Sequence, residues 1–213
     1  TTAKKGFFSR FIGDKAFYSC ENLKEAVLPA VTAVGNYAFY KCTSLAVLSA
    51  AAIETVGDAA FSGCTSLKEV SFPETLQTLG KQAFRGCTML TAVNLPASLT
   101  SVGAHAFYGC KALSFYLEAG MNTENFNERW NSSYRPQVSG CAFNEDGSLA
   151  SFTKSEDAVR YLNVTNALSA PRRAGYTFGG FALTPGGDAL YTENTVLAAE
   201  NGATLYAVWN EEA

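Results

Sequence analysis

The residue types most suited to chemistry in this 213-residue chain are six cysteines and one histidine, His105. A zinc site needs converging ligands, such as Cys-x-x-Cys pairs, and the sequence contains none. A catalytic thiol needs a histidine partner and a special environment, and a Ser-His-Asp site would also depend on His105. The cysteines are therefore either reactive groups or packing residues, and their spacing bears on that choice.

The spacing of the cysteines favours packing. The first five lie 22, 22, 23 and 23 residues apart, namely Cys20, Cys42, Cys64, Cys87 and Cys110. Each follows a glycine by seven positions, and the frame Ala60-Phe61-x-x-Cys64-x-x-Leu67 recurs around every one. An active site is needed once, whereas a packing position is needed in every repeat, and cysteine is among the most often buried residues. Because five parallel side chains do not pair off evenly, the pattern predicts buried free thiols, and Cys141 is expected in a separate core.

Each repeat predicts two short elements. Ala, Phe, Cys and Leu recur at steps of one, three and three residues, which is the spacing of one helix face. Polar and apolar residues then alternate in Glu69, Val70, Ser71 and Phe72, which is typical of a strand. A fixed period in this range indicates a solenoid, because one repeat cannot bury its own apolar face. We therefore predict stacked repeats that form a parallel β-sheet with short helical turns.

The repeat frame resembles the leucine-rich repeats of BspA-like bacterial surface proteins. The frame Gly-x-x-Ala-Phe-x-x-Cys-x-x-Leu-x-x-Val-x-Leu-Pro covers about residues 7–117 and recurs five times. The resemblance implies an α/β-type leucine-rich-repeat solenoid over residues 1–140, with a C-terminal cap at 118–140 where the period breaks. The chain enters the frame mid-repeat at Phe11-Ile12-Gly13, so we expect further repeats before Thr1 in a longer protein.

Residues 141–213 have a different character, with short apolar runs separated by turn signals such as Asn144-Glu145-Asp146-Gly147. The segments Gly175-Tyr176-Thr177-Phe178 and Thr204-Leu205-Tyr206-Ala207-Val208-Trp209, with Gly186-Gly187 between them, resemble the Listeria–Bacteroides repeat, also called the internalin B-repeat. The resemblance implies a small β-grasp-like, mainly-β domain in which Phe181 takes the place of a core tryptophan. Within it, Ser155–Leu162 is predicted as a short helix with Ser155 as its N-cap.

The rest of the sequence gives no sign of an enzyme. His105 aligns with Lys15, Tyr37, Ala59 and Gln82, the most variable column of the repeat, which predicts a surface position. Gly186-Gly187 is followed by no Lys-Ser/Thr, so a phosphate loop is not indicated. The net charge of -3 and the lack of a long apolar run predict neither nucleic-acid binding nor membrane insertion. We expect no catalytic residue, cofactor or metal ion.

The outward positions of the predicted sheet are the best candidates for a binding surface, because solenoids present such columns as extended faces. They fall five and seven residues after each cysteine. The first column is Glu25, Val47, Glu69, Ala92 and Phe115, and the second is Val27, Ser49, Ser71, Asn94 and Leu117. These columns contain no charge stripe or aromatic ladder, so phosphate or glycan recognition is not indicated there. An alternative stays open, in which the cap or the second domain covers Phe115 and Leu117.

The resemblance to surface proteins implies a secreted, extracellular bacterial adhesin without enzymatic activity. Its partner would be a protein of the host or of a neighbouring cell, bound through the sheet face. The alternative is a structural spacer or assembly module within a larger cell-surface protein whose ligand-binding domain lies elsewhere.

Overall fold

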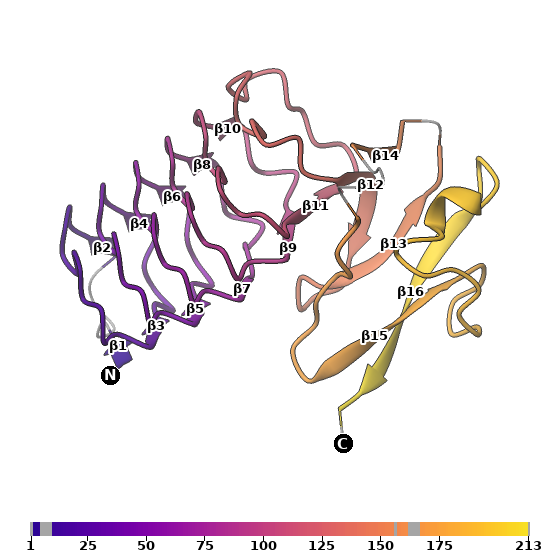
Figure 1. Ribbon diagram of the computed structural model, residues 1–213, viewed down its shortest axis with the longest axis horizontal. Coiled ribbons are helices and arrows are strands. Elements are labelled where there is room, and N and C mark those ends of the chain that lie inside the picture. Colours follow the sequence, from indigo (N-terminus) through magenta and orange to yellow (C-terminus); the bar gives the residue numbers. More distant parts are fainter. Residues whose placement is uncertain (1, 5–9, 156, 162–166, 213) are drawn as a thin grey trace. The chain divides into compact units, whose positions relative to one another are not determined.

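The computed structural model describes residues 2–4, 10–155, 157–161 and 167–212. Their contacts divide the chain into two compact units, and Figure 1 labels the strands of both. The first unit comprises Thr1–Thr91, Pro96–Ala112 and Met121–Tyr134. The second unit comprises Ala92–Leu95, Leu113–Gly120 and Arg135–Ala213.

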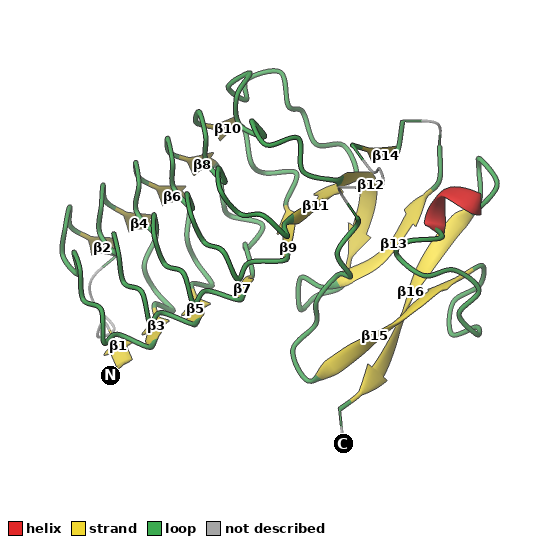
Figure 2. Ribbon diagram, in the orientation of Figure 1, coloured by secondary structure: helices red, strands yellow, loops and turns green. Residues whose placement is uncertain are grey.

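The first unit is a solenoid whose coils contribute to two parallel sheets (Figure 2). The first sheet contains, in order, β1 (Thr2–Lys4), β3 (Glu25–Val27), β5 (Val47–Ser49) and β7 (Glu69–Val70). The second sheet contains β2 (Phe11–Ile12), β4 (Ala33–Val34), β6 (Thr55–Val56), β8 (Thr78–Leu79) and β10 (Ser101–Val102). The predicted parallel-sheet solenoid is thus confirmed, and the second sheet is an addition to it.

The predicted helical turns are wrong, because the backbone between glycine and cysteine has the wrong sign of φ for a helix. An α-helix needs φ near −63° at every residue. The second residue after the glycine instead has φ between 51° and 58° in every coil, and these residues are Lys15, Tyr37, Ala59, Gln82 and His105. The apolar residues at helix-like spacing therefore belong to a series of tight turns.

The hydrogen bonds between glycine and cysteine also explain why this segment does not form the predicted helical turn. The Ala60 N–H donates within its own coil to Gly57 O at 3.4 Å, whereas the next amide, Phe61 N–H, donates to Ala83 O of the following coil at 2.8 Å. The amide of Gly63 likewise donates to Arg85 O at 2.7 Å. Because alternate amides are committed to the neighbouring coil, a continuous helical ladder cannot form.

A column of stacked phenylalanine rings fills the interior of the first unit. Neighbouring ring centroids are 4.9 to 5.5 Å apart and the planes are within 10° of parallel, in Phe17, Phe39, Phe61, Phe84 and Phe107. Such aromatic pairs contribute about 0.5–1.5 kcal/mol each beyond the burial of their area. The recurring Ala-Phe pair of the sequence is thus the centre of the core.

The glycine column lets successive coils approach closely. A Cβ atom at Gly57 would lie 2.8 Å from Asn36 N, and one at Gly80 would lie 2.6 Å from Asp58 N. Beside the glycines, side-chain oxygens join one coil to the next, since Asn36 Oδ1 accepts the Asp58 N–H at 2.8 Å and Asp58 Oδ1 accepts the Lys81 N–H at 2.7 Å. The invariant spacing of glycine and cysteine therefore reflects backbone contact between coils.

The second unit contains one mixed sheet in the order β15-β16-β13-β12-β11-β9, with β14 also paired to β12. Its strands are β9 (Ala92–Leu95), β11 (Ser114–Glu118), β12 (Gln137–Phe143), β13 (Leu149–Thr153), β14 (Val159–Arg160), β15 (Tyr176–Ala182) and β16 (Thr204–Glu211). Strands β9, β11 and β12 run parallel, and the other pairs are antiparallel. Among the described residues, the sole helix is the 3-10 turn η1 (Val196–Ala198).

The helix predicted for Ser155–Leu162 is wrong within its described part. Val159 and Arg160 form β14 and pair antiparallel with Val138 and Gln137, while residues 156 and 162 lie outside the described residues. The short apolar pattern fits a strand as well as a helix turn, and pairing to β12 decides between them. The core position predicted for Phe181 is confirmed, since its fully buried ring packs edge-on against Phe152 at 5.4 Å.

Candidate binding surface

The cysteine side chains act as hydrogen-bond donors between coils. All six are free, and each of four donates its thiol proton to the carbonyl oxygen of a phenylalanine in the preceding coil. The Sγ–O distances are 3.0 to 3.3 Å for Cys42, Cys64, Cys87 and Cys110. A thiolate cannot donate, so this role requires the protonated form.

Burial keeps the thiols of Cys42, Cys64 and Cys87 protonated. It raises the pKa of Cys42 to about 11, and it also raises the pKa values of Cys64 and Cys87 well above the ordinary value. Desolvation also raises the pKa of Cys141, which is buried in the core of the second unit as predicted. A nucleophilic cysteine needs the opposite shift, so these thiols serve packing.

His105 is half-buried in the first unit rather than a free surface residue. Its Nδ1 lies 2.9 Å from Ser132 Oγ, and its ring meets the Tyr108 ring edge-on at 5.6 Å. Neither neighbour is a carboxylate that would orient the imidazole in a Ser-His-Asp site. Within the described ranges, no three His, Cys, Asp or Glu side chains are grouped so as to hold a metal ion. No helix formed by the described residues is long and apolar enough to cross a membrane.

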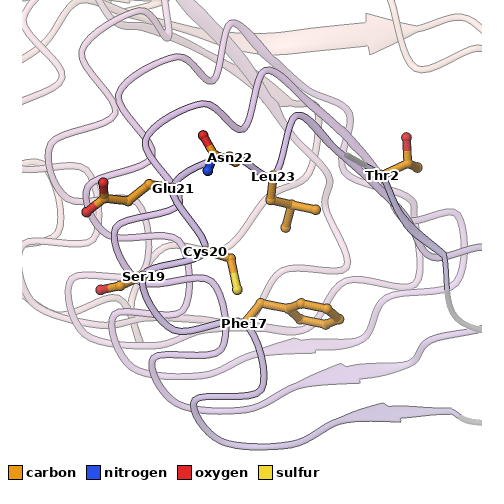
Figure 3. Close-up of a pocket in the computed structure, with 7 residues that line it drawn as sticks. All are labelled: Thr2, Phe17, Ser19, Cys20, Glu21, Asn22 and Leu23. Atoms are coloured by element: carbon orange, nitrogen blue, oxygen red, sulfur yellow. The ribbon is translucent and has the colours of Figure 1, made fainter.

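A cavity of about 520 Å³ opens at the first coil, and Figure 3 shows the side chains around it. Phe17, Cys20 and Leu23 line it together with Thr2, Ser19, Glu21 and Asn22. The first three occupy the packing positions that are fully buried in the next coils, as Phe39, Cys42 and Leu45 are. The cavity is therefore lined in part by core packing positions of the solenoid, and these side chains serve packing.

The outward columns of the first sheet lie where the sequence predicts them in the first unit. Glu25, Val47 and Glu69 are in register across β3, β5 and β7, and Val27 is in register with Ser49. Val47 is 49% exposed, and every other member except half-buried Val27 is exposed as well. We call this surface the sheet-face patch, and it consists of Glu25, Val27, Val47, Ser49, Glu69 and Ser71.

The outward orientation predicted for Phe115 and Leu117 is wrong, since these residues are 0% and 5% exposed. In the sheet of the second unit, Phe115 pairs with Val93 and Leu117 with Leu95. Counting from the cysteines had placed them opposite Ala92 and Asn94, so the strand is shifted by one residue. A shift of one residue moves a side chain to the other face of a sheet.

Ala92 and Asn94 are also unavailable as a free surface. Ala92 is 6% exposed and belongs to the apolar core of the second unit, together with Tyr116. The Asn94 Nδ2 donates to Gly147 O at 2.6 Å, and the Tyr116 hydroxyl donates to Ser169 O at 2.6 Å. Residues of the second unit therefore cover the last part of the predicted columns.

The prediction from sequence overlooked a second exposed surface, formed by the turns between glycine and cysteine. The position five residues after each glycine holds Tyr18, Tyr40, Ser62, Arg85 and Tyr108. Tyr18 and Tyr108 are each 47% exposed. The column can be found by aligning the repeats on their glycines, but the prediction considered only the outward columns of the sheet.

A solenoid of parallel strands with a recurring glycine, phenylalanine, cysteine and leucine frame defines a leucine-rich-repeat protein. The family model described as the BspA type leucine rich repeat region matches residues 10–130 in six copies, so the chain belongs to this family. This match extends beyond Cys110, the last of the five recurring cysteines. Structurally, Asn127 N–H donates to Val102 O at 2.8 Å and His105 N–H donates to Arg129 O at 3.0 Å, so coil-to-coil pairing continues there.

Solved structures of bacterial leucine-rich-repeat proteins match part of this chain. The T. pallidum leucine rich repeat protein TpLRR is 33% identical, with a TM-score of 0.52 over 55% of this chain and 57% of that one. A leucine-rich repeat protein from Bacteroides ovatus is 30% identical, with a TM-score of 0.48 over 52% of this chain and 29% of that one. A leucine rich cell surface protein from Faecalibacterium prausnitzii is 22% identical, with a TM-score of 0.33 over 72% and 50%. No curated protein matches the chain.

The chain spans 57% of the T. pallidum protein and 29% of the Bacteroides ovatus protein. What the longer proteins do as a whole is therefore a matter for proposal. Leucine-rich-repeat proteins are typically non-enzymatic and generally bind proteins, and the protonated thiols and the surroundings of His105 agree with that class.

Proposed function

We propose that this chain is part of a non-enzymatic adhesin on the outside of a bacterial cell, where the sheet-face patch binds a protein of a host or neighbouring cell. The observation that supports the proposal most is the register of Glu25, Val47 and Glu69, which presents an exposed column across three paired strands. Side chains on paired strands are held in fixed positions, which lowers the entropy that ordering an interface costs.

Charge reversal on the patch tests this proposal. The variant E25K/E69K changes two exposed residues of the patch, and E54K/E74K changes two exposed glutamates that lie outside both columns. Both variants change the net charge by the same amount. If E25K/E69K reduces adhesion of protein-coated beads to host-cell monolayers and E54K/E74K does not, the proposal is supported. Equal adhesion by both variants and the unaltered chain would refute it.

We propose further that residues 141–213 are a Listeria–Bacteroides repeat with a β-grasp-like fold. In support, the two halves of the motif form the paired strands β15 and β16, where Phe178 is in register with Trp209. The rings of these residues are 5.5 Å apart, and Trp209 Nε1 donates to Leu149 O at 3.0 Å. The proposed boundary lies within β12 (Gln137–Phe143), so limited proteolysis of the whole chain is expected to spare residues 137–143. Rapid cleavage inside that range would count against a module that uses β12.

A spacer or assembly role is the second candidate. The burial of Ala92, Phe115 and Leu117 favours it, because it restricts the exposed columns to the first unit. On this proposal the chain holds a ligand-binding domain of the parent protein away from the cell surface. Adhesion that is unaffected by E25K/E69K, but lost when residues 1–213 are deleted from the parent protein, would favour this role over direct binding.

A further inference from the structure

The turns of the first unit present a second exposed surface that differs in chemistry from the sheet-face patch. We call it the turn-face stripe and define it as Tyr18, Tyr37, Tyr40, Lys41, Arg85 and Tyr108. All are exposed except Tyr40, which is half-buried. The sheet-face patch, by comparison, consists of glutamate, valine and serine.

The repeat places the members of this stripe in columns that follow the solenoid. Tyr18, Tyr40, Arg85 and Tyr108 occupy the same position of successive repeats, with the buried Ser62 between Tyr40 and Arg85. Tyr37 and Lys41 flank this column, and each has φ of 56°. Alternate amides in these turns donate to the following coil, as Lys41 N–H does to Ser62 O at 2.8 Å. Backbone contact between coils therefore fixes the spacing of the stripe.

The tyrosines at one end of the stripe pack against one another. The Tyr18 and Tyr40 rings are stacked at 5.1 Å with 22° between their planes, and Tyr37 meets Tyr40 edge-on at 5.6 Å. The Lys41 ammonium lies 5.5 Å from the centroid of the Tyr40 ring. These contacts hold three phenol rings and one ammonium group close together on the exposed turns.

The other end of the stripe has the same character. The Arg85 guanidinium lies 5.7 Å from the centroid of the Tyr108 ring, and the His105 ring touches Tyr108 edge-on at 5.6 Å. The Nδ1 atom of His105 in turn lies 2.9 Å from the Oγ atom of Ser132. The sequence has no acidic residue between Glu74 and Glu118, so no carboxylate from that segment competes for Arg85.

We propose that the turn-face stripe binds an acidic glycan chain that lies along the solenoid. Ammonium and guanidinium groups only donate hydrogen bonds, and phenol hydroxyls donate readily, so the stripe suits a ligand rich in negatively charged acceptors. Sulfate and carboxylate groups on a sugar chain supply such acceptors at regular intervals. A linear polymer matches a column that repeats once per coil.

Two other ligand classes fit the stripe less well. Single-stranded nucleic acid binds by stacking bases on exposed aromatic faces, and here Tyr40 and Arg85 each already occupy one face of Tyr18 and Tyr108, which leaves fewer faces for bases. A stable protein interface needs about 800 Å² from each partner, whereas the stripe is one column with two flanking residues. The proposal does not depend on protein binding through the sheet-face patch, since the two surfaces share no residue.

Binding to defined polymers tests the proposal on the whole chain. The probes are heparin as a sulfated glycan, polygalacturonate as a carboxylated glycan, dextran as a neutral glycan and oligothymidylate as a single-stranded nucleic acid. The variant K41Q/R85Q removes two cations of the stripe, and K24Q/K68Q removes two exposed lysines elsewhere, so the two variants have the same net charge. Affinities are measured by calorimetry at low ionic strength, with circular dichroism as the check that each variant is folded.

The expected result is binding of at least one acidic glycan and no binding of dextran. K41Q/R85Q should weaken that binding at least about tenfold, which is the loss expected if only one of the two cations makes a charge-assisted hydrogen bond, and K24Q/K68Q should leave it within about twofold. A sulfated-only or carboxylated-only response identifies which acidic group the stripe prefers. Absence of binding to both acidic glycans, equal loss in the two variants, or tighter binding of oligothymidylate would each overturn the proposal.

Discussion

Replacing Phe61 tests whether the stacked phenylalanine column holds the coils of the first unit together. The Phe61 side chain is fully buried, and its ring lies 5.1 Å from the rings of both Phe39 and Phe84, nearly parallel to each. Two substitutions separate the parts of its contribution. F61A removes the ring and leaves a cavity, whereas F61L keeps much of the apolar volume and removes only the two stacked pairs.

The expected magnitudes follow from this geometry. Truncating a buried phenylalanine to alanine lowers the free energy of unfolding by about 3–5 kcal/mol. Each stacked pair contributes about 0.5–1.5 kcal/mol beyond burial, so F61L should lower it by about 1–3 kcal/mol. V47A is the matched control, because Val47 is 49% exposed and its truncation should change the free energy by less than about 0.5 kcal/mol.

Urea denaturation followed by tryptophan fluorescence measures these differences. Trp130 lies in the first unit and Trp209 in the second, so a W209F background makes the fluorescence report on the solenoid alone. The urea concentration at the midpoint of unfolding should be highest for V47A, lower for F61L and lowest for F61A. The slope of the transition should change little. A loss below about 1 kcal/mol for F61A, or an F61L midpoint equal to that of V47A, would refute the role of the column.

Three further predictions follow from the packing of the coils. G57A should lower the melting temperature, because its Cβ would lie 2.8 Å from Asn36 N. In G13A the new Cβ meets nothing closer than 3.8 Å, so the melting temperature should change little. Equal melting temperatures of the two variants would contradict the claim that the glycines allow successive coils to approach closely. The pKa of Cys42 is raised from 9.0 to about 11 by burial, so its contribution to stability is complete below pH 9 and is lost as the pH rises through 11. In alkaline urea titrations C42A should therefore lose less stability over that range than the unaltered chain, and parallel curves would disprove this. In the native protein iodoacetamide should modify exposed Cys20 first, as mass spectrometry of the digest would show, and early modification of Cys64 would contradict its burial.

The sequence was sufficient to predict the solenoid and its inward residues. Phe61, Cys64 and Leu67 recur at fixed spacing, and a residue type that recurs in every coil reports on packing rather than on a single site. The same spacing led to the incorrect helical turn, because side-chain positions do not record the sign of φ at Ala59. Nor do they show that the Phe61 amide is committed to the next coil.

The candidate surface was predictable only where the repeat is regular. Glu25, Val47 and Glu69 are exposed as expected, since their strands keep the cysteine-based register. At Phe115 the register shifts by one residue, and no signal in the spacing from Cys110 marks that shift. Burial of Ala92 depends on residues distant in the sequence, such as Tyr116 and others of the second core, which periodicity does not encode.

The turn-face stripe was missed for a different reason. Its central column contains tyrosine, serine and arginine, so no single residue type recurs in every repeat as glycine and cysteine do. Variable columns of a repeat protein are the ones free to specialise, because the shared core does not constrain them. In this chain the variable columns are therefore the place to look for function.

The most direct test of the account is adhesion of beads coated with the whole chain, because the central claim is that exposed columns and not cysteine or histidine chemistry carry the function. The account predicts that E25K/E69K lowers bead adhesion to host-cell monolayers, while E54K/E74K and H105N leave it unchanged. H105N removes the imidazole but keeps an amide that can contact Ser132, and asparagine tolerates the φ of 58° at this position. Loss of adhesion in H105N with full adhesion in E25K/E69K would contradict the account.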